Sequence, residues 1–105
     1  MTENKPIFLS TKDNFRDLIN SNPVVLVDFY ADWCGPCKKL DPIIEDKTKN
    51  KSIKVIKVSV DDFQDLAEEY NVASVPNVFL FKNGKIVDSF VGFDLNGLER
   101  LIKQI

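Results

Sequence analysis

Apolar residues are grouped along the chain in stretches that have the length and spacing of β-strands. Residues 24–29 are almost all Val, Leu or Phe, which is typical of a central strand buried on both faces. Residues 53–60 alternate between apolar and polar side chains, as a strand does. Two further apolar runs, at 78–81 and 86–91, flank an Asn-Gly pair, the strongest short-range signal of a β-hairpin. Together with a short apolar run at 6–9, the pattern predicts five strands.

Between these strands, apolar residues recur at helical spacing and predict four helices. In the first helix, Ser10 has the character of an N-cap with Asp13 at the capping-box position, and the polar run 20–23 ends the helix. The second helix covers residues 34–49 and contains Pro42. We expect a kink there within one continuous helix, because proline removes a backbone hydrogen bond.

The last two helices complete the order of elements. Asp61 or Asp62 is expected to cap the third helix, which ends at Asn71 in a left-handed conformation, and residues 95–105 carry the apolar stripe of the fourth. The order is therefore β-α-β-α-β-α-β-β-α, in which the alternating part implies parallel strands and the end an antiparallel hairpin. We predict an α/β fold in one domain, residues 1–105, with a mixed sheet and helices on both faces.

The charge and composition of the chain exclude several classes of function. Its 105 residues include 14 basic and 16 acidic side chains, which give a formal net charge of −2. We expect no nucleic acid partner, because phosphate binding needs a basic face. No apolar run reaches the length of a membrane span, and the first residues lack the apolar region of a signal peptide. We therefore expect a cytoplasmic protein without membrane contact.

The two cysteines of the chain, Cys34 and Cys37, follow a predicted strand and open a predicted helix. Residues three apart lie on one face of a helix, so their α-carbons fall within the range of about 4.4–6.8 Å that a disulfide tolerates. In a cytoplasmic protein such a pair is more often catalytic or metal-binding than structural. Because the chain has no histidine, two thiols cannot complete a four-ligand zinc site, and we expect no metal. A metal shared by two chains of a dimer is the alternative.

The position of the two thiols favours reactivity. The free N–H groups and the dipole of a helix N-terminus stabilise a thiolate, which is the attacking species. Pro36 fits the first helical turn, and Gly35 leaves room beside the sulfur for another protein. We expect Cys34, nearer the helix end and more exposed, to attack a disulfide in a partner, and Cys37 to resolve the mixed disulfide by attacking Cys34. The alternative is a pair of inert buried cysteines.

Charged and aromatic residues near the thiols are further candidates. Asp28 interrupts the apolar run 24–29, where burial raises the pKa of a carboxyl above its usual value of about 4. It is expected either to accept the proton of the buried thiol or to be a structural buried polar group. Trp33 is expected to pack against the thiol loop, to shield the sulfurs and to form part of a docking surface. Asp32 and Asp41 would disfavour a thiolate, but we expect both to be exposed and screened, with little effect.

These segments resemble the thioredoxin family over almost the whole chain. The resemblance implies the thioredoxin fold, a central mixed five-stranded sheet flanked by four helices. It rests on five groups of residues: Val25-Leu26-Val27-Asp28-Phe29, Trp33-Cys34-Gly35-Pro36-Cys37-Lys38, Val75-Pro76, Lys82-Asn83-Gly84 and Gly92.

The resemblance also implies roles for particular residues. The family residue that matches Asp28 relays a proton from the resolving cysteine through water, and Lys57 matches its partner, although the strand pattern also allows Lys57 to be solvated. Pro76 matches a cis-proline that faces the two sulfurs, where the sequence pattern alone also allows an ordinary proline at a strand start. The backbone of Val75 is expected to pair with substrate, and Gly92 to let substrate lie close. The expected catalytic residues are thus Cys34, Cys37, Asp28 and Lys57, and the expected substrate-binding residues are Trp33, Gly35, Pro36, Val75, Pro76 and Gly92.

Four positions depart from the usual pattern of the family. Asn77 follows the proline in place of Thr, Tyr30 replaces a common Trp or Ser, and Phe93 is larger than the usual residue beside Gly92. Asp41 is an acid where the family usually has a neutral residue. These departures bear on the choice of partner and on the reduction potential, and they leave the cysteine pair intact.

The function that the resemblance implies is that of an enzyme, a thioredoxin-type protein-disulfide reductase that carries electrons in cell redox homeostasis. It would be a monomer without a cofactor of its own, with disulfide-containing client proteins and thioredoxin reductase as partners. One alternative is an isomerase or oxidase, which the Gly-Pro between the cysteines disfavours because isomerases of the family usually carry Gly-His. Another is a binding module that uses the fold as a scaffold for assembly.

Overall fold

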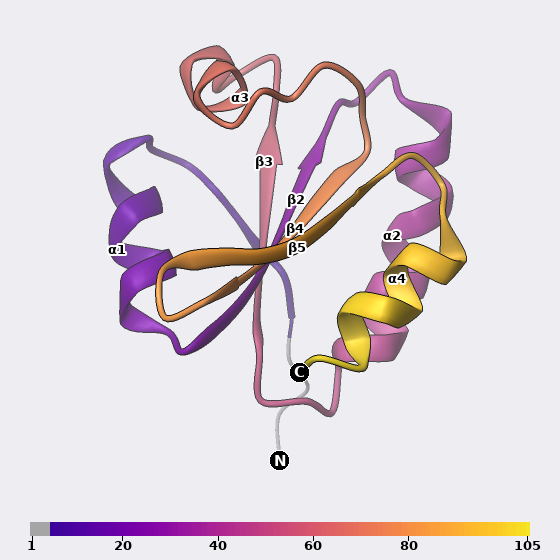
Figure 1. Ribbon diagram of the computed structural model, residues 1–105. Helices are drawn as coiled ribbons and strands as arrows, with labels where there is room; N and C mark the ends of the chain where they lie inside the picture. The colour runs from indigo at the N-terminus through magenta and orange to yellow at the C-terminus, as the bar shows by residue number, and fades with distance from the viewer. Residues whose placement is uncertain (1–4) are drawn as a thin grey trace.

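A computed structural model describes residues 5–105 of the chain. A five-stranded mixed sheet forms its centre, with the strand order β1-β3-β2-β4-β5 (Figure 1). β2 pairs in parallel with β3 and antiparallel with β4, β1 is parallel to β3, and β5 is antiparallel to β4. The strands are β1 (Ile7–Phe8), β2 (Val24–Tyr30), β3 (Lys54–Ser59), β4 (Asn77–Lys82) and β5 (Lys85–Val91).

Four helices in the described residues cover the two faces of this sheet. Figure 1 shows α1 and α3 on one side and α2 and α4 on the other. Two separate apolar clusters match this arrangement: one joins Phe15 of α1 and Leu66 of α3 to the sheet, and the other joins Leu40 of α2 and Leu98 of α4 to it. The predicted α/β architecture is confirmed. The helices are α1 (Asp13–Ser21), α2 (Gly35–Thr48), α3 (Gln64–Glu69) and α4 (Leu95–Ile102).

The central strand β2 is apolar because both of its faces are covered. Alternate residues of a strand share a face. Val25 and Val27 belong to the cluster under α1 and α3, whereas Leu26 belongs to the cluster under α2 and α4. Asp28 is two residues beyond Leu26, so the pleat places it on the face that α2 covers.

The turns follow the sequence prediction. Asn71 has a φ of 56° directly after α3 and its C-cap, as expected of a left-handed terminator. Asn83 and Gly84 have φ values of 54° and 81° between β4 and β5, which are the angles that a tight hairpin turn requires. Pro42 lies inside α2, which remains one helix across it as predicted.

Two predicted helix caps are wrong. α1 begins at Asp13 with Lys12 as its N-cap residue, two positions after the expected Ser10 cap, and no side chain caps it. α3 begins after Phe63, also without a side-chain cap. Asp61 does not cap α3, because its carboxylate accepts a hydrogen bond from Trp33. The backbone N–H of Asp62 is bonded to the hydroxyl of Ser59, which begins the turn before the helix starts.

Candidate active site

Cys34 and Cys37 form a disulfide at the N-terminus of α2. Their α-carbons are 5.3 Å apart, within the predicted range. Cys34 is the N-cap residue itself, one position before the helix, and its Sγ accepts a hydrogen bond of 3.1 Å from the backbone N–H of Cys37. Pro36 lies in the first turn, where a proline costs no hydrogen bond. The sulfur of Cys34 therefore takes the place of a capping oxygen at the positive end of the helix.

Both cysteines are buried, with 4% of Cys34 and 2% of Cys37 exposed. The predicted difference in exposure is therefore small in the disulfide form. Ala31 is buried with them, and Tyr30 and Val75 pack against this cluster. Gly35 is exposed, and apart from its chain neighbours and the nearby backbone of its own helix, no heavy atom of the described residues lies within 4 Å of the place where its Cβ would be. An incoming chain thus finds open space beside the sulfurs on the side of Gly35.

A second backbone segment lies against the disulfide. The Val75–Pro76 peptide bond is cis, and the carbonyl oxygen of Val75 is 3.6 Å from the Sγ of Cys34. The carbonyl of Pro76 accepts a hydrogen bond of 2.7 Å from the N–H of Gly92. Gly92 has a φ of 84°, which a side chain would oppose, and its surroundings are open within 4 Å. The fold thus brings Cys34, Val75, Pro76 and Gly92 together from segments far apart in the sequence.

The side chain of Trp33 is exposed. It is 71% exposed, and its Nε1–H donates a hydrogen bond of 3.0 Å to Oδ2 of Asp61. The apolar cluster around the cysteines does not include it. This exposure does not fit the predicted packing of Trp33 against the thiol loop, and its indole N–H has its partner at the start of the loop after β3 instead. Its exposure leaves a flat aromatic surface next to Cys34.

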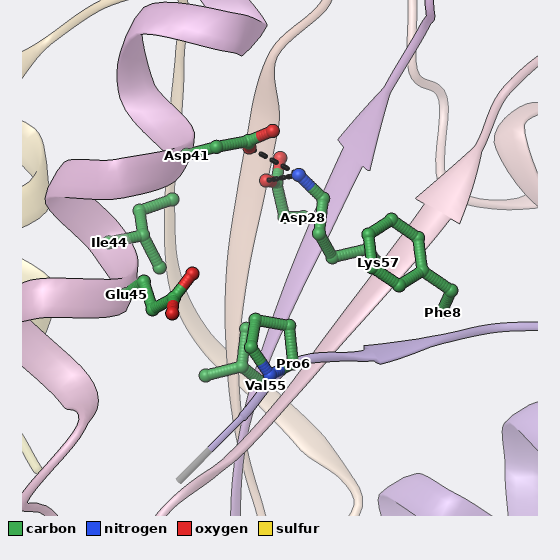
Figure 2. A pocket seen from close by; sticks show the side chains of 8 residues that line it. All are labelled: Pro6, Phe8, Asp28, Asp41, Ile44, Glu45, Val55 and Lys57. Atoms are coloured by element: carbon green, nitrogen blue, oxygen red, sulfur yellow. Dashed lines mark hydrogen bonds and ion pairs between the residues drawn. The ribbon is translucent and has the colours of Figure 1, made fainter. Parts of the chain in front are cut away.

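Asp28 and Lys57 meet beneath the disulfide-bearing helix, as Figure 2 shows. The parallel register of β2 and β3 sets the two residues opposite each other. Nζ of Lys57 is 3.3 Å from Oδ2 of Asp28, and both side chains are almost fully buried. The alternative of a solvated Lys57 is thereby excluded. The ammonium also lies over the ring of Tyr30, at 4.6 Å from its centroid, and this contact partly offsets the burial of its charge.

Asp41 is the functional candidate that the sequence prediction placed wrongly. Rather than being free and screened, its Oδ1 accepts a hydrogen bond from Nζ of the same Lys57. Asp41 lies one helical turn beyond Cys37 on α2, and Figure 2 shows it pointing from that helix towards Lys57 and Asp28. The spacing of four residues from Cys37 was the signal that could have located it, since such pairs share a helix face.

The carboxyl of Asp28 titrates far from its usual range. Burial raises its pKa, Lys57 lowers it and Asp41 raises it again, so that the pKa is about 7. Its Oδ1 atom has no hydrogen-bond partner among the described residues. A cavity of about 120 Å³ opens beside it (Figure 2). Its lining comes from Pro6, Phe8, Asp28, Asp41, Ile44, Glu45, Val55 and Lys57.

The remaining departures from the family pattern also surround the site. Tyr30 packs against the cysteine cluster, and burial raises the pKa of its phenol. Asn77 is buried at the start of β4, directly after the cis-proline. Phe93 is exposed beside Gly92.

A disulfide at a helix N-terminus, with a cis-proline against it and a buried carboxyl below it, defines a class of dithiol–disulfide proteins built on a mixed sheet. The sequence profile of the thioredoxin family matches residues 6–105. The chain belongs to the thioredoxin family.

Individual relatives agree with this assignment. The chain is 47% identical to the mitochondrial thioredoxin of Mus musculus over 96 residues, which cover 88% of this chain and 58% of that protein. It therefore spans less than two thirds of the length of that relative. It is 46% identical to the thioredoxin of Chlamydia caviae, with 88% of this chain and 91% of that protein covered.

A solved structure agrees as well. The thioredoxin of Malassezia sympodialis superposes with a TM-score of 0.89 at 32% identity, covering 99% of this chain and 93% of that one. The predicted thioredoxin fold is confirmed. In the part of the chain that the structure describes, no helix is both long enough and apolar enough to cross a membrane.

Proposed function

We propose that the protein is a thiol–disulfide oxidoreductase that reduces disulfides in partner proteins. The observation that carries this proposal is the Cys34–Cys37 disulfide at the N-terminus of α2, against the cis Val75–Pro76 bond. Membership of the thioredoxin family supports it. An inert structural disulfide would have no need of an open approach beside Gly35 or of a hydrogen bond from the helix N-terminus to the sulfur.

The reaction proceeds in two exchange steps. In the reduced protein, the Cys34 thiolate attacks one sulfur of a partner disulfide, forms a mixed disulfide and releases the other partner sulfur as a thiolate. Cys37 then loses its proton and attacks the sulfur of Cys34. This step breaks the mixed disulfide, releases the second partner thiolate and leaves Cys34 and Cys37 oxidised. Two electrons pass from the dithiol to the partner.

Helix α2 supplies part of the activation. The N–H of Cys37 donates to the sulfur of Cys34, and such a bond is stronger to a thiolate than to a thiol. The helix dipole acts in the same direction. We propose Asp28 as the base that takes the proton of Cys37, since it is a buried carboxyl on the face that α2 covers, with a pKa of about 7. Lys57, with its Nζ 3.3 Å from Oδ2 of Asp28, stabilises the carboxylate form that accepts this proton.

The proposed docking surface surrounds the open side of the disulfide. The exposed ring of Trp33 and the backbone of Val75 border it. An extended segment of a client can pair with this backbone in the manner of an added strand. The space beside Gly35 and Gly92 lets such a segment come close to the sulfurs. Pro36, exposed in the first turn of α2, and the cis Pro76 complete the surface.

The proposal also covers the oligomeric state, the reductase partner and the cellular compartment of the protein. We propose that residues 1–105 act as one monomeric domain, which the single continuous sheet supports. Oxidised protein is returned to the dithiol form by a thioredoxin reductase that draws electrons from NADPH. The cytoplasm is the proposed compartment, because a cysteine pair used in exchange rather than as a structural crosslink suits a reducing environment.

Trapping of mixed disulfides tests the two cysteine roles. Cys37→Ser is expected to accumulate a covalent complex with a disulfide-containing protein, because the resolving thiol is missing. Cys34→Ser is expected to trap none. The measurement is non-reducing electrophoresis after mixing each variant with oxidised insulin, with the double variant as the control. Equal trapping by both single variants would overturn the assignment, and retained reductase activity in the double variant would overturn the function.

A further inference from the structure

The ammonium group of Lys57 contacts two carboxylates beneath the active site. Nζ of Lys57 bonds Oδ1 of Asp41 and also lies 3.3 Å from Oδ2 of Asp28, as the dashed lines of Figure 2 mark. Asp28 is buried, whereas the Asp41 side chain is 40% exposed. Asp41 is therefore the member of this trio that reaches solvent, and Asp28 keeps one oxygen without a partner among the described residues.

We propose that Asp41 is a positioning residue that shares the Lys57 ammonium with Asp28. By doing so it sets the pH at which Asp28 takes up the proton of Cys37. This inference rests on the proposed function, in which Asp28 is the base. Asp41 does not touch the reacting sulfurs in this scheme. It acts through Lys57 and through its own charge.

The physical argument is one of competition. A lysine that belonged to Asp28 alone would stabilise the carboxylate and make it a weak base at neutral pH. Asp41 draws the same ammonium to itself and adds a second negative charge. Both effects oppose ionisation of Asp28, in the same direction as burial. The carboxyl then titrates near neutrality, which is where a base for a thiol proton is most effective.

Apart from Asp41, Lys57 and Glu45, the groups named here around Asp28 are uncharged. From α2, Asp41 and Glu45 line the cavity. Lys57 comes from β3, and on β2 itself the phenol of Tyr30 has a raised pKa and remains neutral. The partner of Asp28 across β4 is the uncharged Val78. The part of β1 that lines the cavity contributes Phe8, and Pro6 precedes it.

Glu45 provides a matched control. It lines the same cavity from the same helix and carries the same charge as Asp41. It is not among the described residues that bond Lys57, and it is not a cause of the pKa shift of Asp28. Glu45→Gln and Asp41→Asn therefore remove one charge each, but only the second releases the ammonium.

The experiment follows the resolving step directly. Reduced protein is mixed with one equivalent of dithiobis(nitrobenzoate) in a stopped-flow instrument between pH 5 and 9. One nitrothiobenzoate ion is released when Cys34 attacks, and a second when Cys37 resolves the mixed disulfide. The pH dependence of the second phase reports the groups that take the proton of Cys37, here the coupled carboxylates.

Asp41→Asn is expected to move the midpoint of this second phase to lower pH by about 0.5–1 unit, because the freed Lys57 stabilises the Asp28 carboxylate. Glu45→Gln is expected to move it by less than half as much. Asp41→Glu, which keeps the charge, is expected to restore the midpoint. Lys57→Met is expected to move it to higher pH, and in that background Asp41→Asn should have a much smaller effect, since no ammonium remains to be divided.

Equal shifts in Asp41→Asn and Glu45→Gln, or no shift in Asp41→Asn, would overturn the role of Asp41. Asp28→Asn separates this failure from that of the proposed base. If Asp28→Asn keeps the wild-type midpoint, Asp28 is not the base and the proposed proton transfer fails. If Asp28→Asn abolishes this titration while the Asp41 and Glu45 variants behave alike, only the Asp41 inference fails. Thermal unfolding of each variant checks that the compared proteins are folded.

Discussion

Asp28 illustrates how one buried residue couples stability to chemistry. Its carboxyl has a usual pKa of 3.8 and a pKa of about 7 in the folded chain, chiefly because burial disfavours its charge. Between these two pH values the unfolded chain has lost a proton that the folded chain retains. Stability therefore falls as the pH rises from about 4 to about 7, and the loss is complete above that range.

Asp28→Asn is expected to remove this penalty. The variant should be more stable than the wild type by about 2–4 kcal/mol at pH 8, and the difference should shrink as the pH falls towards 4. Urea unfolding of the oxidised proteins across this range measures it, with the thiols absent from the titration. Asp46→Asn, which removes an exposed carboxylate on α2, is the control and should change stability by less than about 0.5 kcal/mol. A difference between Asp28→Asn and wild type that is constant with pH would contradict the prediction.

Helix α4 shows, at the scale of an element, how packing against the sheet can outweigh helix propensity. Asp94 caps it through a hydrogen bond of 2.9 Å to the N–H of Gly97, and Leu98 and Leu101 bury its inner face. A glycine inside a helix normally costs about 1 kcal/mol relative to alanine. Here a Cβ at Gly97 would lie 2.8 Å from the Cβ of Phe90 on β5. The close approach of helix and sheet therefore explains this glycine.

Gly97→Ala is expected to destabilise the protein by about 1–3 kcal/mol despite the better helix propensity of alanine, because Phe90 would have to move within a packed core. Asn96→Ala is the matched control: it is the neighbouring exposed position of α4 and should be neutral or slightly stabilising. Urea unfolding compares the two variants. If Gly97→Ala were as stable as Asn96→Ala, the helix would be able to shift away from β5 and the steric argument would fail.

The elements were predictable from the sequence where one local pattern determines them. The apolar run of β2 and the Asn-Gly turn each point to a single structure, and both were confirmed. The caps of α1 and α3 were not predictable, since a capping side chain can be drawn elsewhere by a tertiary partner. Asp61 is an example, as the indole of Trp33 occupies its carboxylate.

The packing of the whole molecule explains why the contact between the cysteines was predicted from the sequence and the contact of Asp41 with Lys57 was not. The spacing of Cys34 and Cys37 is enough to predict their contact, because both lie within one helical turn. The spacing of Asp41 from Cys37 places both residues on one face of α2, but the contact of Asp41 with Lys57 also depends on how α2 packs across β2 and β3. The same packing places Asp28 and Lys57 beneath the resolving cysteine's helix. The sheet thus supplies the proton chemistry, and α2 supplies the thiols.

The reduction potential of the Cys34–Cys37 pair tests the direction of electron flow for the molecule as a whole. Family membership leads us to expect a value near that known for thioredoxins, about −270 mV, rather than the value of about −180 mV of protein disulfide isomerase. Trp33, the only tryptophan and the neighbour of Cys34, provides a fluorescence signal in defined thiol buffers. Trp33→Phe, followed by alkylation of free thiols, is the control for effects of the probe itself. A value near −270 mV would mean that this dithiol can reduce most exposed protein disulfides. A value near −180 mV or higher would mean that Tyr30, Asp41 and Phe93 have turned the site towards disulfide exchange or formation, and the proposed reductase would be wrong in direction.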